Sequence, residues 1–177
     1  VVEEILSDFD KHFNNSLDIL SSRKLGIKNK SKITISLYSD LLKLMEIGKA
    51  DFTHTFKSLK TILIKEDTSI FLNNFKDLDE ETQRGLSKWL SDWRKLLMEN
   101  NDSKTKAIEL LSASNPEFIM RNHLVEKSIR KATKGDFSDF EILSDLLLNP
   151  FEMKENYEAF YKAPTDREVV HQTFCGT

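Results

Sequence analysis

The sequence predicts an all-α fold of about seven to eight helices. Apolar residues recur at intervals of three and four along most of its 177 residues, which is the spacing of amphipathic helices. Short polar residues, Gly and Pro separate these stretches at positions that suit helix caps and turns. The longest strand-like alternation covers only residues 33–37, and no internal repeat is visible.

Six helices are predicted before residue 115, each from one apolar stripe that would face a core. The fifth stripe, with two tryptophans, is the most regular. In chain order the stripes are Ile5, Leu6, Phe9, Phe13, Leu17 and Leu20; Leu37, Leu41, Leu44 and Met45; Phe52, Phe56, Leu59 and Leu63; Phe71, Leu72 and Phe75; Leu86, Trp89, Leu90, Trp93, Leu96 and Leu97; and Ala107, Ile108, Leu110 and Leu111.

Polar residues and one glycine predict where these helices begin and end. Asp51, Asp79 and Ser103 stand where a side chain can accept from the free N–H groups of a first turn. Thr68 stands before the short fourth helix, and Gly48 can terminate the second.

Residues 115–136 predict one long helix with both ends marked. Asn115 can cap it, Pro116 suits its first position, and Glu117 faces the positive end of its dipole. Gly135 can take the left-handed conformation that ends a helix. The residues near one face of this helix are Phe118, Val125, Ile129 and Ala132.

A last helix follows, from a capping-box pattern of Ser138 and Glu141 to a stop before Pro150. Its apolar residues are Phe140, Leu143, Leu146 and Leu147. Residues 157–161 predict a single turn and residues 167–177 a tail. We therefore divide the chain into a helical domain, residues 1–149, and a C-terminal tail, residues 150–177.

Composition narrows the class of protein. A net charge of −3 gives no positive excess for nucleic acid or anionic lipid. No apolar run approaches the roughly 18 residues of a membrane helix. One cysteine allows no intrachain disulfide, so we expect a reducing compartment such as the cytoplasm. The chain opens Val-Val, without Met and directly in helical periodicity, so we expect it to be cut from a longer protein.

No residue here is predicted to be catalytic, cofactor-binding or metal-binding. A kinase-like site needs a glycine-rich phosphate loop, and the five glycines are not paired within one loop. Residues 135–137, Gly-Asp-Phe, are in the wrong order for a magnesium motif and predict a helix end followed by a helix start. Asp51/His54 and Glu168/His171 have a spacing used in di-metal bundles, but surface histidines are the alternative that we favour.

Three further groups have a functional and a structural interpretation. Trp89 and Trp93 could line a ligand pocket, although helical aromatic stripes are more often core. Arg121 and Asn122 are expected to tie helices together rather than to perform chemistry. The basic segment could meet a phosphate or be a solvated loop, and its lysines are Lys24, Lys28, Lys30 and Lys32.

Residues 115–122, 135–138 and 150–151 form a pattern that resembles the C-terminal part of the selenoprotein O family. A second matching block is residues 41–59, so the resemblance spans about residues 41–177. Phe118 stands where Tyr is usual, and His123 where another aromatic is usual. The matching residues are Asn115, Pro116, Arg121, Asn122, Gly135, Asp136, Phe137, Ser138, Pro150 and Phe151.

The resemblance implies a C-terminal segment of a kinase-like enzyme that transfers AMP from ATP to Ser, Thr or Tyr hydroxyls of proteins. The segment would support the N-terminal kinase-like catalytic part without catalysing anything alone. ATP and Mg²⁺ would bind that other part, and the partners would be protein substrates, not nucleic acid or membrane. In a eukaryote the family implies a mitochondrial location. The alternative is a self-standing helical interaction domain without enzymatic activity, whose grooves receive a partner helix.

Cys175 is the one redox candidate. It stands third from the end, where the family has selenocysteine or cysteine linked to redox control, and Gly176-Thr177 replaces the usual Ser-Ser. A cysteine in such a tail is expected to be accessible. The alternative is a free thiol with no role.

Overall fold

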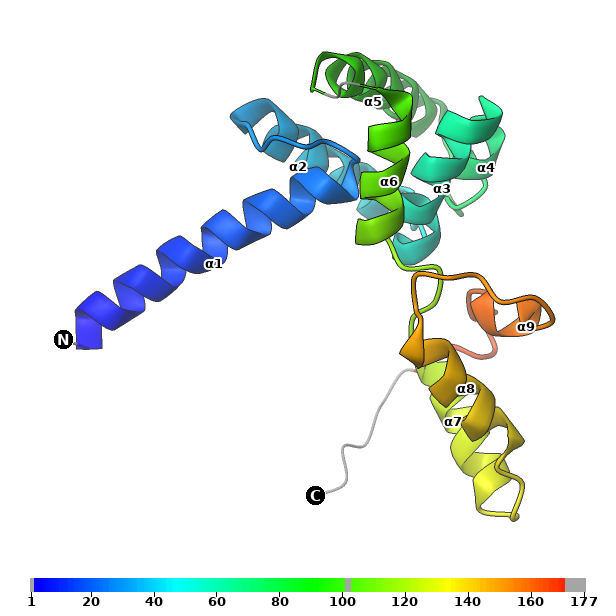
Figure 1. The fold of residues 1–177 in the computed structure, drawn as a ribbon. Coiled ribbons are helices and arrows are strands. Elements are labelled where there is room, and N and C mark those ends of the chain that lie inside the picture. The colour runs from blue at the N-terminus through cyan, green and yellow to red at the C-terminus, as the bar shows by residue number, and fades with distance from the viewer. Residues whose placement is uncertain (1, 101–102, 171–177) are drawn as a thin grey trace. The chain divides into compact units, whose positions relative to one another are not determined.

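The structure is a computed structural model that describes residues 2–100 and 103–170. These residues form nine α-helices and a single isolated antiparallel bridge, between Ala50 and Phe75 (Figure 1). The all-α prediction is confirmed, and the expected helix number is close, because α4 and α9 are single turns of four residues. Residues 33–37 belong to a helix. The chain forms two compact units, residues 1–115 and 116–177, so the boundary predicted after residue 149 lies inside the second unit.

Unit 1 contains six helices around one core. They are α1 (Val2–Lys24), α2 (Lys32–Ile47), α3 (Phe52–Lys65), α4 (Ser69–Leu72), α5 (Glu80–Asn100) and α6 (Lys104–Ser114). Helix α2 packs on α5, α3 packs on α4 and α6, and α1 contacts α2 and α6. The two tryptophans of α5 are buried and stacked, with ring centroids 5.9 Å apart. The tryptophan stripe is therefore core, as its periodicity predicted.

The predicted caps of unit 1 are confirmed. The carboxylates of Asp51 and Asp79 accept from the backbone N–H groups of His54 and Thr82, at 2.8 and 2.7 Å. Ser103 caps α6 by accepting from the N–H of Lys106 at 3.2 Å. Each bond satisfies one of the N–H groups that a helix leaves free at its start.

Gly48 ends α2, but not in a left-handed conformation. Its φ is −83°, and the left-handed residue is Lys49, with a φ of 48°. Glycine is required at this position because a Cβ on Gly48 would lie only 2.6 Å from Cδ1 of Phe75.

The apolar stripe predicted to bury α1 is exposed. Phe9, Phe13, Leu17 and Leu20 are 63%, 55%, 47% and 56% exposed. Among the described side chains of α1, those of Ser21 and Ser22 at its C-terminal end are the buried ones. The side chains of Ile5 and Leu6 lie outside the described part of the structure.

Unit 2 contains α7 (Asn122–Ala132), α8 (Ser138–Leu148) and α9 (Glu158–Tyr161). Its core is small and includes a residue from α9, so the segment after residue 149 is part of the packing. Phe118 and Tyr161 meet edge to face with centroids 6.1 Å apart. The buried core residues are Phe118, Leu124, Leu143, Leu146 and Tyr161.

The helix predicted over residues 115–136 begins seven residues later, at Asn122. Asn115 is instead the C-cap residue of α6, with extended backbone. It precedes Pro116, and a residue before a proline is biased away from helical backbone. The N–H of Phe118 donates to the carbonyl of Pro150 at 3.0 Å, and its ring is buried. These long-range contacts hold residues 116–121 out of the helix. The other end is confirmed, because Gly135 has a φ of 84° and the next N–H returns to Lys131.

The buried faces of α7 and α8 are also rotated from the prediction. On α7, Leu124 and Ser128 are buried and Ile129 is exposed. On α8, Phe140 and Leu147 are exposed whereas Leu143 and Leu146 are buried.

The predicted capping box at the start of α8 is not formed. Ser138 is the first helical residue, and the carboxylate of Asp136 accepts from its N–H at 3.0 Å. Asp139 faces α7, where its carboxylate meets the amine of Lys131 at 2.6 Å. The carboxylate of Asp139 is buried and the amine of Lys131 is partly exposed, so the pair gives a buried charge the partner that it needs.

Candidate functional site

The single redox candidate, Cys175, lies outside the described residues, and so does His171. Glu168 is described, and its carboxylate accepts from both the N–H and the hydroxyl of Thr165, at 2.9 and 2.7 Å. The backbone N–H of Thr165 is the main reason why the pKa of Glu168 is held below its ordinary value. This carboxylate therefore closes a local turn.

The described glycines serve packing and turns. Gly26 has a φ of 73°, and a Cβ there would lie 2.8 Å from Cγ of Leu111. A Cβ on Gly85, inside α5, would lie 2.8 Å from Cδ2 of Leu44. Gly135 turns the chain between α7 and α8, and Asp136 then holds the start of α8. The Gly-Asp-Phe sequence is thus a helix end and a helix start, as predicted.

The Asp51/His54 spacing serves a helix cap. One oxygen of Asp51 accepts the backbone N–H of His54 at 2.8 Å and lies 3.8 Å from its Nδ1. In the part of the chain that the structure describes, no group of three or more His, Cys, Asp or Glu residues could hold a metal ion.

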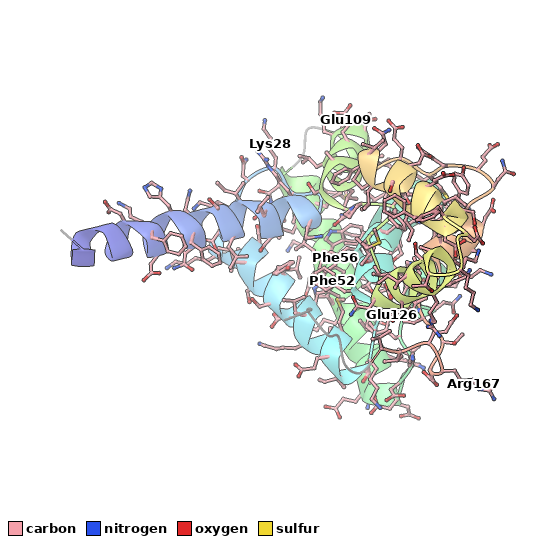
Figure 2. All side chains as sticks on the ribbon, turned by 90° about the horizontal axis from the view of Figure 1, so that it is seen from below. Lys28, Phe52, Phe56, Glu109, Glu126 and Arg167 are labelled. Atoms are coloured by element: carbon pink, nitrogen blue, oxygen red, sulfur yellow. The ribbon has the colours of Figure 1, made fainter. Side chains whose placement is uncertain are left out.

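The lysines of the segment 24–32 do not converge on one site. Lys28 is exposed (Figure 2). Lys30 bonds Asn15 and lies 4.0 Å from Asp18. The segment is also not simply solvated, because Leu25 and Ile27 are fully buried.

Lys24 points into unit 1 and ties α1 to two other helices. Its amine donates to Oδ1 of Asn115 at 3.1 Å, and the amide of Asn115 donates to the carbonyl of Lys24 at 3.0 Å. The same amine lies 5.3 and 4.9 Å from the ring centroids of Phe52 and Phe56, which lie side by side on α3 (Figure 2). Burial lowers the pKa of Lys24. The arrangement is a cation–π and hydrogen-bonded junction between α1, α3 and the end of α6.

A cavity of about 690 Å³ in unit 1 was not predicted from the sequence. It lies beside α3, α5 and the start of α6, with an ion pair of 3.3 Å between Lys104 and Glu66 at its edge. Trp89 and Trp93 do not line it. The lining residues are Ile62, Leu63, Glu66, Arg94, Leu97, Met98, Ser103 and Lys104.

In unit 2, Arg121 and Asn122 stand at the start of α7, not inside a helix as predicted, and the side chain of Arg121 does not cap α7. They border a cavity of about 320 Å³ together with His123 and Glu168. Burial is the main cause that lowers the pKa of His123, and the carboxylate of Glu168 opposes it. Periodicity could not find this proximity, because the two residues are far apart in the sequence and joined only by the fold.

Within the described residues, no helix is both long and apolar enough to cross a membrane. The described polar side chains named above serve packing, helix caps and turns.

Relatives with the name protein nucleotidyltransferase YdiU match nearly the whole chain. The one from Bacillus thuringiensis subsp. konkukian is 34% identical over 179 residues, covering 100% of this chain and 34% of the relative. The relative from Rhizobium meliloti is 37% identical, and the matched region covers 96% of this chain and 33% of the relative. The relative from Clostridium perfringens is 31% identical, and the matched region covers 100% of this chain and 34% of the relative. The chain therefore spans about a third of the length of these relatives.

A family model described as protein adenylyltransferase SelO matches residues 1–148, which include α1 to α8. The match agrees with the resemblance in the sequence and extends it toward the N-terminus. The chain belongs to the protein adenylyltransferase SelO family.

Proposed function

We propose that residues 1–177 are a helical part of a longer protein adenylyltransferase that modifies Ser, Thr or Tyr hydroxyls of protein substrates. In this reaction a hydroxyl oxygen bonds to the α-phosphorus of ATP, pyrophosphate leaves, and the hydroxyl proton passes to a base. The observation that carries the proposal is the family match over residues 1–148 in a chain that covers 34% of a relative's length.

The role proposed for this part is to support a kinase-like catalytic part, not to catalyse. The described glycines and Asp136 support this, because each is already used in packing or in a helix end. We therefore assign ATP and Mg²⁺ to the remainder of the longer protein. A cytoplasmic location is proposed with it, supported by a sequence with one cysteine.

The test is label transfer from ATP to protein. We expect label from the α-phosphate to reach protein substrates with the longer protein and not with chain 1–177. Label on the γ-phosphate should not be transferred, since it leaves with pyrophosphate. Transfer by chain 1–177 alone would contradict the supporting role, and transfer of the γ-label by the longer protein would contradict adenylylation.

We also propose that Cys175 is a redox-sensitive residue of the longer protein. The sequence has one cysteine, so a disulfide partner would lie outside this chain. Two thiols would lose two electrons and two protons to a disulfide oxidant such as oxidised glutathione. We expect rapid thiol labelling and a reductant-sensitive gel shift, both absent in Cys175→Ser. A thiol that labels only after denaturation would overturn the proposal.

A further inference from the structure

Helix α1 has a continuous apolar stripe that none of the described residues of unit 1 covers. The stripe consists of Phe9, Phe13, Leu17 and Leu20, spaced by four, four and three residues and therefore on one side of the helix. All four side chains are about half exposed or more, and the rings of Phe9 and Phe13 stack with centroids 6.0 Å apart. Within unit 1, the N-terminal half of α1 extends away from the other helices (Figures 1 and 2).

The opposite side of α1 is polar. Lys11, Asn14 and Asp18 lie away from the stripe, so one side of the helix is apolar and another is polar, as in a surface helix that packs on a core. Scattered exposed apolar residues are ordinary, but a contiguous stripe of large ones marks an interaction surface. The C-terminal end of α1 already meets its own core through the buried residues Ser21 and Ser22. The uncovered part is the part that reaches beyond unit 1.

The rest of the longer family protein is the occupant that best fits this stripe. The family match includes all of α1, so the helix belongs to the architecture that the longer relatives share. This chain matches 34% of the length of such a relative. The other two thirds, roughly, are long enough to contain a surface that packs on one face of a helix. A partner on the same polypeptide is present at high effective concentration, so four side chains can suffice without a separate large interface.

We propose that Phe9, Phe13, Leu17 and Leu20 form the contact by which this part of the protein packs on an apolar surface of the portion that chain 1–177 lacks. The inference depends on the proposed function only in taking the chain to be part of a longer family protein. It does not depend on AMP transfer. In the longer protein the stripe is buried, and in chain 1–177 it faces solvent.

The test compares two single cysteines on α1, each in a Cys175→Ser background. Phe13→Cys reports on the stripe, and Asn14→Cys is the matched control on the polar side of the same turn. The rate of maleimide labelling is measured site by site with mass spectrometry, in chain 1–177 and in the longer protein. We expect both sites to label rapidly in chain 1–177. In the longer protein the Phe13→Cys site should label at least tenfold more slowly, with the control unchanged.

Equal labelling of Phe13→Cys in both proteins would overturn the proposal. Protection that appears in chain 1–177 itself and rises with its concentration would overturn it too, because a second copy would then cover the stripe. Light scattering on the same samples identifies that case. Labelling does not require activity, so protection without AMP transfer would refute the proposed activity and leave the packing surface in place.

Discussion

At the scale of single residues, Trp93 provides the largest expected effect on stability. Its side chain is fully buried, and its indole N–H donates to the carbonyl of Leu25 at 2.8 Å. Trp93→Ala should lower the free energy of unfolding by about 3–5 kcal/mol, because it leaves a cavity and an unpaired carbonyl. Urea unfolding of chain 1–177 measures this change. Lys95→Ala, on the exposed side of α5, is the control, and a Trp93→Ala effect no larger than that of the control would contradict the core assignment.

Asn115 contributes in a different way from the one its sequence context predicted. It was expected to cap a following helix, but its amide and carbonyl both bond Lys24, on α1. Asn115→Ala should cost roughly 1–3 kcal/mol, because the partly buried amine and the carbonyl of Lys24 each lose a partner. The same urea series ranks it against Trp93→Ala. If Asn115→Ala proves the more damaging, the stripe of α5 carries less of the core than its burial indicates.

At the scale of secondary-structure elements, the start of α5 should depend on pH through Asp79. Hydrogen bonds from the hydroxyl of Thr82 and, after it, from its backbone N–H hold the pKa of this carboxylate below its ordinary value of 3.8. A lowered folded-state pKa means that the stabilisation is present above pH 3.8 and is lost as the pH falls through the folded-state pKa. Asp79→Ala should therefore lower the melting temperature most at pH 7 and less at a pH below the folded-state pKa, where only the uncharged cap remains to be lost.

Thermal melts of chain 1–177 at both pH values check this expectation. Asp79→Asn is the matched control, because asparagine caps a helix without a charge and should keep its melting temperature advantage over Asp79→Ala at both pH values. A difference between Asp79→Ala and wild type that is the same at both pH values would contradict the role of the charged cap.

The elements also show which parts of the fold the sequence can predict. Caps and core stripes of unit 1 were found because they depend on neighbours within a few residues, as at Asp51 and along α5. The start of α7 was missed because it is decided by Phe118, whose N–H bonds Pro150 far along the chain. Local preference is weak and tertiary contacts override it.

The exposed stripe of α1 illustrates the other limit. Its periodicity correctly predicts a helix with one apolar side, but periodicity cannot say whether the covering surface belongs to the same unit. Prediction of the candidate site has the same limit. The sequence identifies Cys175 by resemblance, whereas the proximity of His123 and Glu168 at one cavity depends on the fold.

At the scale of the whole molecule, the proposed function divides the work between this helical part and the rest of a longer protein. The described helices use their polar residues on caps, turns and ion pairs, as Asp51, Asp79 and Asp136 do. Binding of a nucleotide with its metal needs several backbone N–H groups around the phosphates and carboxylates for the ion. Those groups would have to come from the portion of the longer protein outside this chain.

Chain 1–177 should therefore not bind ATP–Mg²⁺ with useful affinity. Gly26, Gly48 and Gly85 each lie against another side chain, and the carboxylate of Asp136 is bonded to Ser138, so neither a phosphate cradle nor a free metal carboxylate exists at these positions. Isothermal titration calorimetry should give no saturable heat with chain 1–177 but a binding curve with the longer protein. A Kd near 1 μM, worth about −8.2 kcal/mol, in chain 1–177 would contradict the expectation. Such a result would mean that this helical part holds the nucleotide itself, and the division of work between it and the rest of the protein would have to be reversed.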